Sequence, residues 1–140
     1  MALGAENHPL LRTLPRLRLT PELFGKLFIL AWAESYGRSD LADRDRIISA
    51  FLSGADDAPS AVRDVMHLED RITGPSIAEY TDYMVAAQDD GLLKRWNPAH
   101  VRCYVEVGED EAETMLADYE NEFADVVSWL RKRIKEIAHE

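Results

Sequence analysis

The spacing of the hydrophobic residues changes twice along the chain, and this change limits the folds open to it. Up to Gly91 the apolar side chains recur every three or four positions, which is typical of helices. From Val101 to Val107 apolar and polar residues alternate, which is the period of a half-buried strand. After residue 109 the helical spacing returns. The sequence therefore predicts a mostly helical chain with one two-stranded hairpin near its end.

Capping and turn residues divide the first part into four expected helices. Thr20-Pro21-Glu22 is a favourable start, because it offers a hydroxyl cap, a proline in the first turn and a carboxylate near the positive end of the dipole. Gly54 and Gly91 end later helices. The expected helices span residues 20–37, 39–54, 60–70 and 75–90.

The expected hairpin consists of strands at residues 92–96 and 101–107, joined by a turn at Asn97-Pro98. The last helix should run from Glu109 to Ala138. Its apolar residues fall at spacings of three and four, which suits packing on another helix. With two positions of the first helix they form a predicted homodimer seam: Leu23, Leu27, Leu116, Tyr119, Phe123, Val126, Leu130 and Ile134.

A chain of 140 residues fits one domain. We expect an N-terminal arm at residues 1–19 and a single winged helix-turn-helix domain at residues 20–140. The start of the chain does not follow the plan of a signal peptide, and the longest apolar stretch is too short to span a bilayer. A single cysteine suits a reducing compartment, so the expected location is the cytoplasm, without membrane association.

The segment from Tyr80 to Val107 resembles the wing region of the MarR family of transcription regulators. The resemblance lies in Gly91-Leu92-Leu93-Lys94-Arg95, Asn97-Pro98, Arg102 and Val105-Glu106-Val107. It implies a homodimer that binds double-stranded DNA, with the fourth helix in the major groove and the wing on the neighbouring backbone. It also implies release of DNA by a small aromatic effector. His100 and Val101 stand where the family usually has an acid and an arginine.

The candidate DNA contacts come from the fourth helix and from the wing. If Ile77, Tyr80 and Met84 face inward, the helical period directs Glu79, Asp82, Tyr83 and Ala86 outward. Lys94, Arg95 and Arg102 would hold phosphates. The predicted DNA-binding set is Arg71, Ser76, Glu79, Tyr83, Lys94, Arg95, Asn97, His100 and Arg102.

The net charge of −10 opposes this interpretation, because DNA binders usually carry a basic stripe. The acid is concentrated after residue 50, and two carboxylates fall on the predicted outward face of the fourth helix. An alternative is therefore a winged-helix relative that has lost DNA binding and acts as an acidic protein-interaction or inhibitor module. Neither alternative is an enzyme, since no nucleophile motif, phosphate loop or cofactor motif is present.

Three smaller predictions complete the sequence interpretation. Cys103 lies on the apolar side of the second strand, which favours a buried thiol over a redox sensor. The four histidines lack metal-ligand spacing, so no metal site is expected. The large aromatic residues could line an effector pocket or form ordinary core: Trp32, Tyr36, Trp96 and Trp129.

Overall fold

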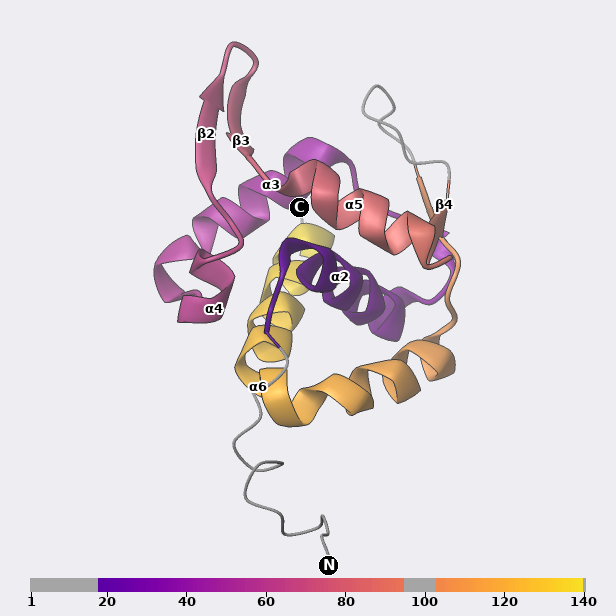
Figure 1. Ribbon diagram of the computed structural model, residues 1–140. Helices are drawn as coiled ribbons and strands as arrows, with labels where there is room; N and C mark the ends of the chain where they lie inside the picture. The colour runs from indigo at the N-terminus through magenta and orange to yellow at the C-terminus, as the bar shows by residue number, and fades with distance from the viewer. Residues whose placement is uncertain (1–17, 95–102, 140) are drawn as a thin grey trace, which may run out of the picture.

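The computed structural model describes residues 18–94 and 103–139, and the described chain is mostly helical, as predicted. Its buried hydrophobic side chains form one cluster. Figure 1 shows helices around this core and short strands at its rim. The elements are α2 (Pro21–Tyr36), β1 (Ser39–Asp40), α3 (Arg44–Ser53), the 3-10 turn η1 (Ala55–Asp57), α4 (Ser60–Arg63), β2 (Leu68–Arg71), β3 (Gly74–Ile77), α5 (Tyr80–Asp89), β4 (Leu93–Lys94), β5 (Tyr104–Val105) and α6 (Glu109–His139).

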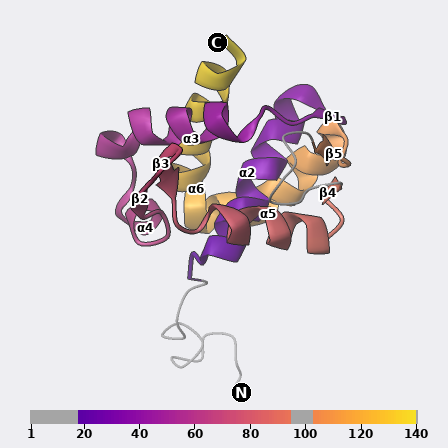
Figure 2. The same cartoon turned by 90° about the horizontal axis from the view of Figure 1, so that it is seen from above.

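Helix α2 occupies the middle of the fold, between α5 and α6 (Figures 1 and 2). It begins as predicted, because the Thr20 hydroxyl accepts a hydrogen bond from Leu23 N and Pro21 opens the first turn. Residues 27–33 are buried without interruption, so nearly every face of the helix is covered. At Gly25 the backbones of α2 and α5 meet so closely that a Cβ would lie less than 3.0 Å from backbone atoms of Tyr83.

Helix α6 has the predicted bounds to within a residue, but it is kinked. Phe123 has non-helical angles (φ −124°, ψ 34°), and Figure 1 shows the helix bending around α2 at this level. Just beyond, Asp125 Oδ1 accepts a hydrogen bond from Val126 N at 2.8 Å, so a side chain satisfies a backbone donor where the helix resumes. The kink lets α6 follow α2 and reach α3.

The predicted dimer seam lies in the core of the single chain. Leu27, Leu116, Val126 and Leu130 are fully buried, and Phe123 and Ile134 are nearly so. Leu23 and Tyr119 are half-buried and pack against the same cluster. The expectation of an unpartnered apolar face was wrong because α2 and α6 cover each other within one chain. The six buried residues of this set therefore offer no surface to a second copy.

The hairpin β4–β5 is confirmed, although its strands are shorter than predicted in the described part. β5 pairs antiparallel with both β4 and β1, in the order β1-β5-β4, with Ser39 and Leu93 on either side of Val105. The prediction that Ser39-Asp40 opens a helix was wrong. These residues form β1, and α3 begins later, where Asp43 Oδ1 caps Arg46 N at 3.0 Å.

A second hairpin, β2–β3, replaces parts of two expected helices. α4 ends at Arg63, and residues 68–71 pair antiparallel with residues 74–77. The two-residue turn between the strands is followed by Gly74 at φ 122°, a conformation that favours glycine. Pro75 and Ser76 therefore lie in a strand, and the fourth helix, α5, starts only at Tyr80.

Candidate nucleic-acid interface

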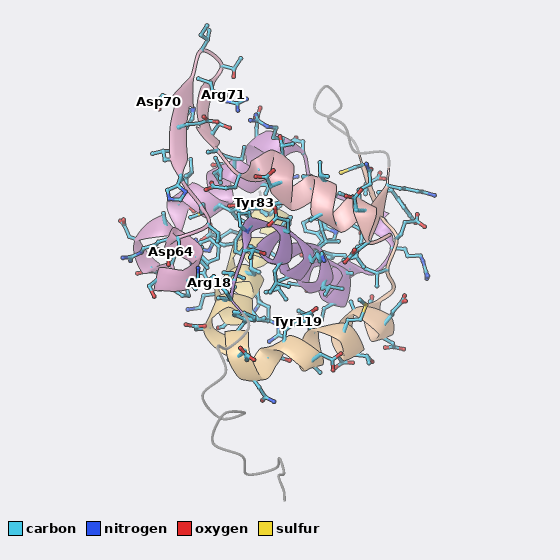
Figure 3. All side chains as sticks on the ribbon, viewed as in Figure 1. Arg18, Asp64, Asp70, Arg71, Tyr83 and Tyr119 are labelled. Atoms are coloured by element: carbon cyan, nitrogen blue, oxygen red, sulfur yellow. The ribbon has the colours of Figure 1, made fainter. Side chains whose placement is uncertain are left out.

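The exposed face of α5 differs from the predicted one. Tyr83 is completely buried, and its hydroxyl donates a 2.6 Å hydrogen bond to Val65 O. Figure 3 shows the Tyr83 side chain within the helical body. Burial raises the pKa of this phenol. Tyr83 therefore anchors the helix and cannot read bases, because the close contact of α5 with α2 turns this side inward. Ala86 is buried as well.

The side chains that α5 exposes are two carboxylates, one hydroxyl and one aliphatic group. Thr81, Asp82, Val85 and Asp89 face outward, and none of them is a cation. Asp82 was predicted to face outward, and this is confirmed. Two carboxylates on this face repel phosphates, although an aspartate can accept a hydrogen bond from cytosine. The helical period therefore predicted only part of this face, because it placed Tyr83 and Ala86 on the outward side.

Ser76 and Glu79 hold the base of the β2–β3 hairpin against the helices. Ser76 is buried, and its hydroxyl accepts a 2.7 Å hydrogen bond from Arg44, whose guanidinium also lies 5.5 Å from the centre of the Tyr80 ring. Glu79 accepts hydrogen bonds from His67 N, at 2.8 Å, and from His67 Nδ1. The side chains of both predicted DNA-binding residues, Ser76 and Glu79, are therefore already hydrogen-bonded within the chain.

The Glu79–His67 pair is a charged clamp between the start of the hairpin and the start of α5. The hydrogen bond and the charge of Glu79 raise the pKa of His67. Partial burial works to raise the pKa of Glu79, but the hydrogen bonds from His67 outweigh it and the pKa is lowered. The pair is therefore favoured in its ionised form.

The β4–β5 hairpin carries the other predicted DNA contacts. Lys94 is exposed; its Nζ lies 3.0 Å from Glu106 Oε2 and 5.5 Å from the centre of the Tyr104 ring. Lys94 therefore has a carboxylate partner that DNA would have to displace. Four further members of the predicted set lie outside the described residues: Arg95, Asn97, His100 and Arg102.

Arg71 lies near the outer end of the β2–β3 hairpin (Figure 3). Its Nε and Nη2 both donate to Glu69 Oε2, at 3.0 and 2.8 Å. Other described cations are also paired with carboxylates: Lys26 with Asp90 at 2.7 Å, and Arg131 with Glu34 at 2.7 Å. Neutralising DNA phosphates would compete with these pairs.

Of the aromatic residues proposed for an effector pocket, Trp32 and Trp129 are core residues, whereas Tyr36 is exposed. Trp32 Nε1 donates to Ser39 Oγ at 3.1 Å, and Trp129 Nε1 donates to Gly54 O at 3.0 Å. Tyr36 packs on Trp32, with ring centres 4.9 Å apart, and borders a surface hollow of about 550 Å³ lined mainly by Arg38, Gly108 and residues 109–111. Trp96 lies outside the described residues. The two described indoles therefore serve packing.

Cys103 is buried, as predicted. Burial, with a contribution from Asp40, raises the pKa of its thiol to about 11, so the reactive thiolate is disfavoured. Within residues 18–94 and 103–139 there is no group of three or more histidine, cysteine or carboxylate side chains that could hold a metal ion. No described helix is long and apolar enough to cross a membrane.

The β2–β3 hairpin was missed in the sequence. Its tip and outer strand expose two aliphatic side chains, Ile72 at 107% and Leu68 at 63%. The available signal was the Thr73-Gly74-Pro75 cluster, which is typical of a turn. Because the strands on either side are only four residues long, their periodicity is too short to distinguish a hairpin turn from a break between helices.

The chain matches no protein-family model, no curated protein and no solved structure.

Proposed function

We propose that this chain is a winged helix-turn-helix protein of the MarR type that acts as a dimeric, DNA-binding transcription regulator. The observation that carries the proposal is the sheet order β1-β5-β4 directly after α5. A winged helix places such a hairpin behind the second helix of a helix-turn-helix, so that helix and hairpin can contact one stretch of duplex. Here α5 would be the helix that enters the major groove, and β4–β5 would form the wing.

The register of β1 supports this assignment. β1 comes between α2 and α3, yet it pairs with β5, with Asp40 opposite Tyr104. The wing is thereby attached to the helical core on two sides, through β1 and through the short connection from α5. A wing held in this way keeps a constant orientation relative to α5, which binding a regular duplex requires.

In this proposal the wing supplies most of the affinity. Residues 94–102 contain Lys94, Arg95 and Arg102 and no carboxylate. The exposed face of α5 carries Asp82 and Asp89, whose carboxylates repel phosphates. This helix therefore contributes discrimination between bases rather than affinity for DNA. Thr81, Asp82 and Val85 take the place of Tyr83 as the residues available to base edges.

The test is capture of fragmented genomic DNA by the purified protein at low salt, repeated at higher salt. We expect enrichment of a two-fold-symmetric site with half-sites about one helical turn apart. On that site, Arg95→Ala and Arg102→Ala should each weaken binding for all sequences and reduce the salt dependence by about one phosphate contact. Lys132→Ala, an exposed cation of α6, is the matched control and should change neither quantity.

One observation favours the alternative of an acidic protein-interaction module without DNA binding. The first half of α6, from Glu109 to Asp125, contains eight carboxylates and no lysine or arginine, and most of these acids are exposed. Such a surface attracts a basic protein and repels nucleic acid. A folded protein that enriches no DNA at low salt would remove the first proposal and leave this one.

A further inference from the structure

The β2–β3 hairpin stands away from the helical body, with β2 on the side away from α5 (Figures 1 and 2). Its base is held by the Glu79–His67 clamp, by the Arg44–Ser76 hydrogen bond and by the buried Ile77. The base of the hairpin is thus attached to the helices, and its outer residues lie outside the core. Figure 3 shows Asp70 and Arg71 toward its outer end.

The register shows which backbone groups point away from the hairpin. Ala78 N donates to His67 O at 2.8 Å, so the pairs 67–78, 69–76 and 71–74 are the hydrogen-bonded ones of this antiparallel ladder. The N–H and C=O groups of Leu68 and Asp70 therefore point outward from the free edge of β2. On the other edge, Pro75 occupies an outward position and has no N–H, which blunts that edge.

The free edge of β2 is complementary to a second copy of itself. Its residues run Leu68-Glu69-Asp70-Arg71, and Ile72 follows at the turn. With two antiparallel copies centred on Asp70, Glu69 of each lies opposite Arg71 of the other, and Leu68 opposite Ile72. Shifting the register by two residues would instead place Glu69 against Glu69, or Arg71 against Arg71. Only the centred register pairs opposite charges and apolar side chains together.

We infer that this chain forms a homodimer by antiparallel pairing of the β2 edges, giving a four-stranded sheet across the two-fold axis. The backbones of the two Asp70 residues then exchange hydrogen bonds, and Glu69 and Arg71 form two ion pairs between copies. Both ends of the interface cover Leu68 and Ile72, which are 63% and 107% exposed in the single chain. Arg71 already contacts Glu69 within one copy. In the dimer it would exchange this carboxylate for that of Glu69 in the other copy.

The two Asp70 carboxylates are the unfavourable element of this interface. They lie on the same face, directly opposite each other, and like charges in that position are destabilising. Asp70 therefore limits the affinity, as charged residues on edge strands often limit association. Removing this charge should strengthen the dimer, and this outcome distinguishes β2 pairing from an interface in which Asp70 stays solvated.

The inference supplies the dimer contact that the proposed function requires and that the buried α2–α6 seam does not provide. The test is sedimentation velocity of the full chain without DNA, so that its outcome is separate from DNA binding. Glu69→Arg and Arg71→Glu should each weaken the dimer about tenfold or more, because both symmetric pairs become repulsive. The double variant Glu69→Arg/Arg71→Glu should return to within about threefold of the original affinity, because the charges are exchanged.

Asp70→Asn should strengthen the dimer by about threefold or more, whereas Asp82→Asn on the exposed face of α5 is the matched control and should not. Asp70→Pro removes an outward N–H without touching the ladder to β3, so it should give a folded monomer. A double variant no better than its single variants would overturn the inference. The inference would also be overturned if both the original chain and Asp70→Asn sedimented as monomers. A dimer whose affinity none of these substitutions changed would overturn it as well.

Discussion

The close crossing of α2 and α5 makes Gly25→Ala the sharpest test of the packing. A Cβ at this position would lie less than 3.0 Å from the carbonyl oxygen, Cα and carbonyl carbon of Tyr83. These are backbone atoms of a buried helix, so the helices must separate to admit the methyl group. Overpacking of this kind costs about 1–3 kcal/mol and sometimes more, whereas alanine gains about 1 kcal/mol in helix propensity. Because the obstruction is backbone, we expect a cost at the upper end of this range, which after the gain in propensity leaves a net loss of about 2 kcal/mol in the free energy of unfolding.

The assay is urea unfolding followed by tryptophan fluorescence, since Trp129 lies in the core. Lys26→Ala, one residue away on α2, is the control: it removes only the half-exposed pair with Asp90 and should cost less than about 1 kcal/mol. For Gly25→Ala, the urea concentration at the unfolding midpoint should fall, while the dependence of the unfolding free energy on urea concentration stays unchanged. A Gly25→Ala protein as stable as the original, or more stable, would refute the close approach of α2 and α5.

Two further predictions concern titratable groups. The pKa of His67 is raised above 6.5 by Glu79, so the protonated His67 contributes stability that is fully present below pH 6.5 and is lost as pH rises through the raised value. The pKa of Glu79 is lowered from 4.5, so its contribution is present above pH 4.5 and is lost as pH falls through the lowered value. The urea midpoint of the original protein should therefore fall between about pH 6 and about pH 8, and in His67→Gln this fall should be smaller. An equal fall in both proteins would contradict the clamp. Cys103, with its pKa raised to about 11, should react with a thiol reagent at neutral pH only after unfolding; rapid labelling of the folded chain would contradict its burial.

Local signals along the chain determined much of the helical content. The first helix begins at Thr20-Pro21 because capping and proline act within one turn, and the long C-terminal helix follows from its regular apolar spacing. The alternation around Cys103 predicted a buried thiol, which is confirmed, and a strand over residues 101–107, of which the described part is a strand only at Tyr104–Val105. In each case the interactions that decide the structure lie close together in sequence.

The candidate site depended more on tertiary structure. The helical period could not determine that Tyr83 faces inward, because Gly25 of a distant helix permits the close contact that buries it. The outward residues of α5 and the occupied positions of Ser76 and Glu79 follow from that packing. Charge and composition predicted an acidic surface, but which cations are paired depended on contacts such as Arg131 with Glu34, far apart in the chain.

The sequence by itself therefore determined where most helices lie and which strand face is apolar, since caps and periodicity are local properties. Only the tertiary structure decided that α6 covers α2 within one chain rather than in a dimer, because a seam of apolar residues does not specify its partner. It also decided that residues 68–77 form a hairpin. Four-residue strands carry little periodicity, and pairing across Gly74, together with the contacts at the base, stabilises them.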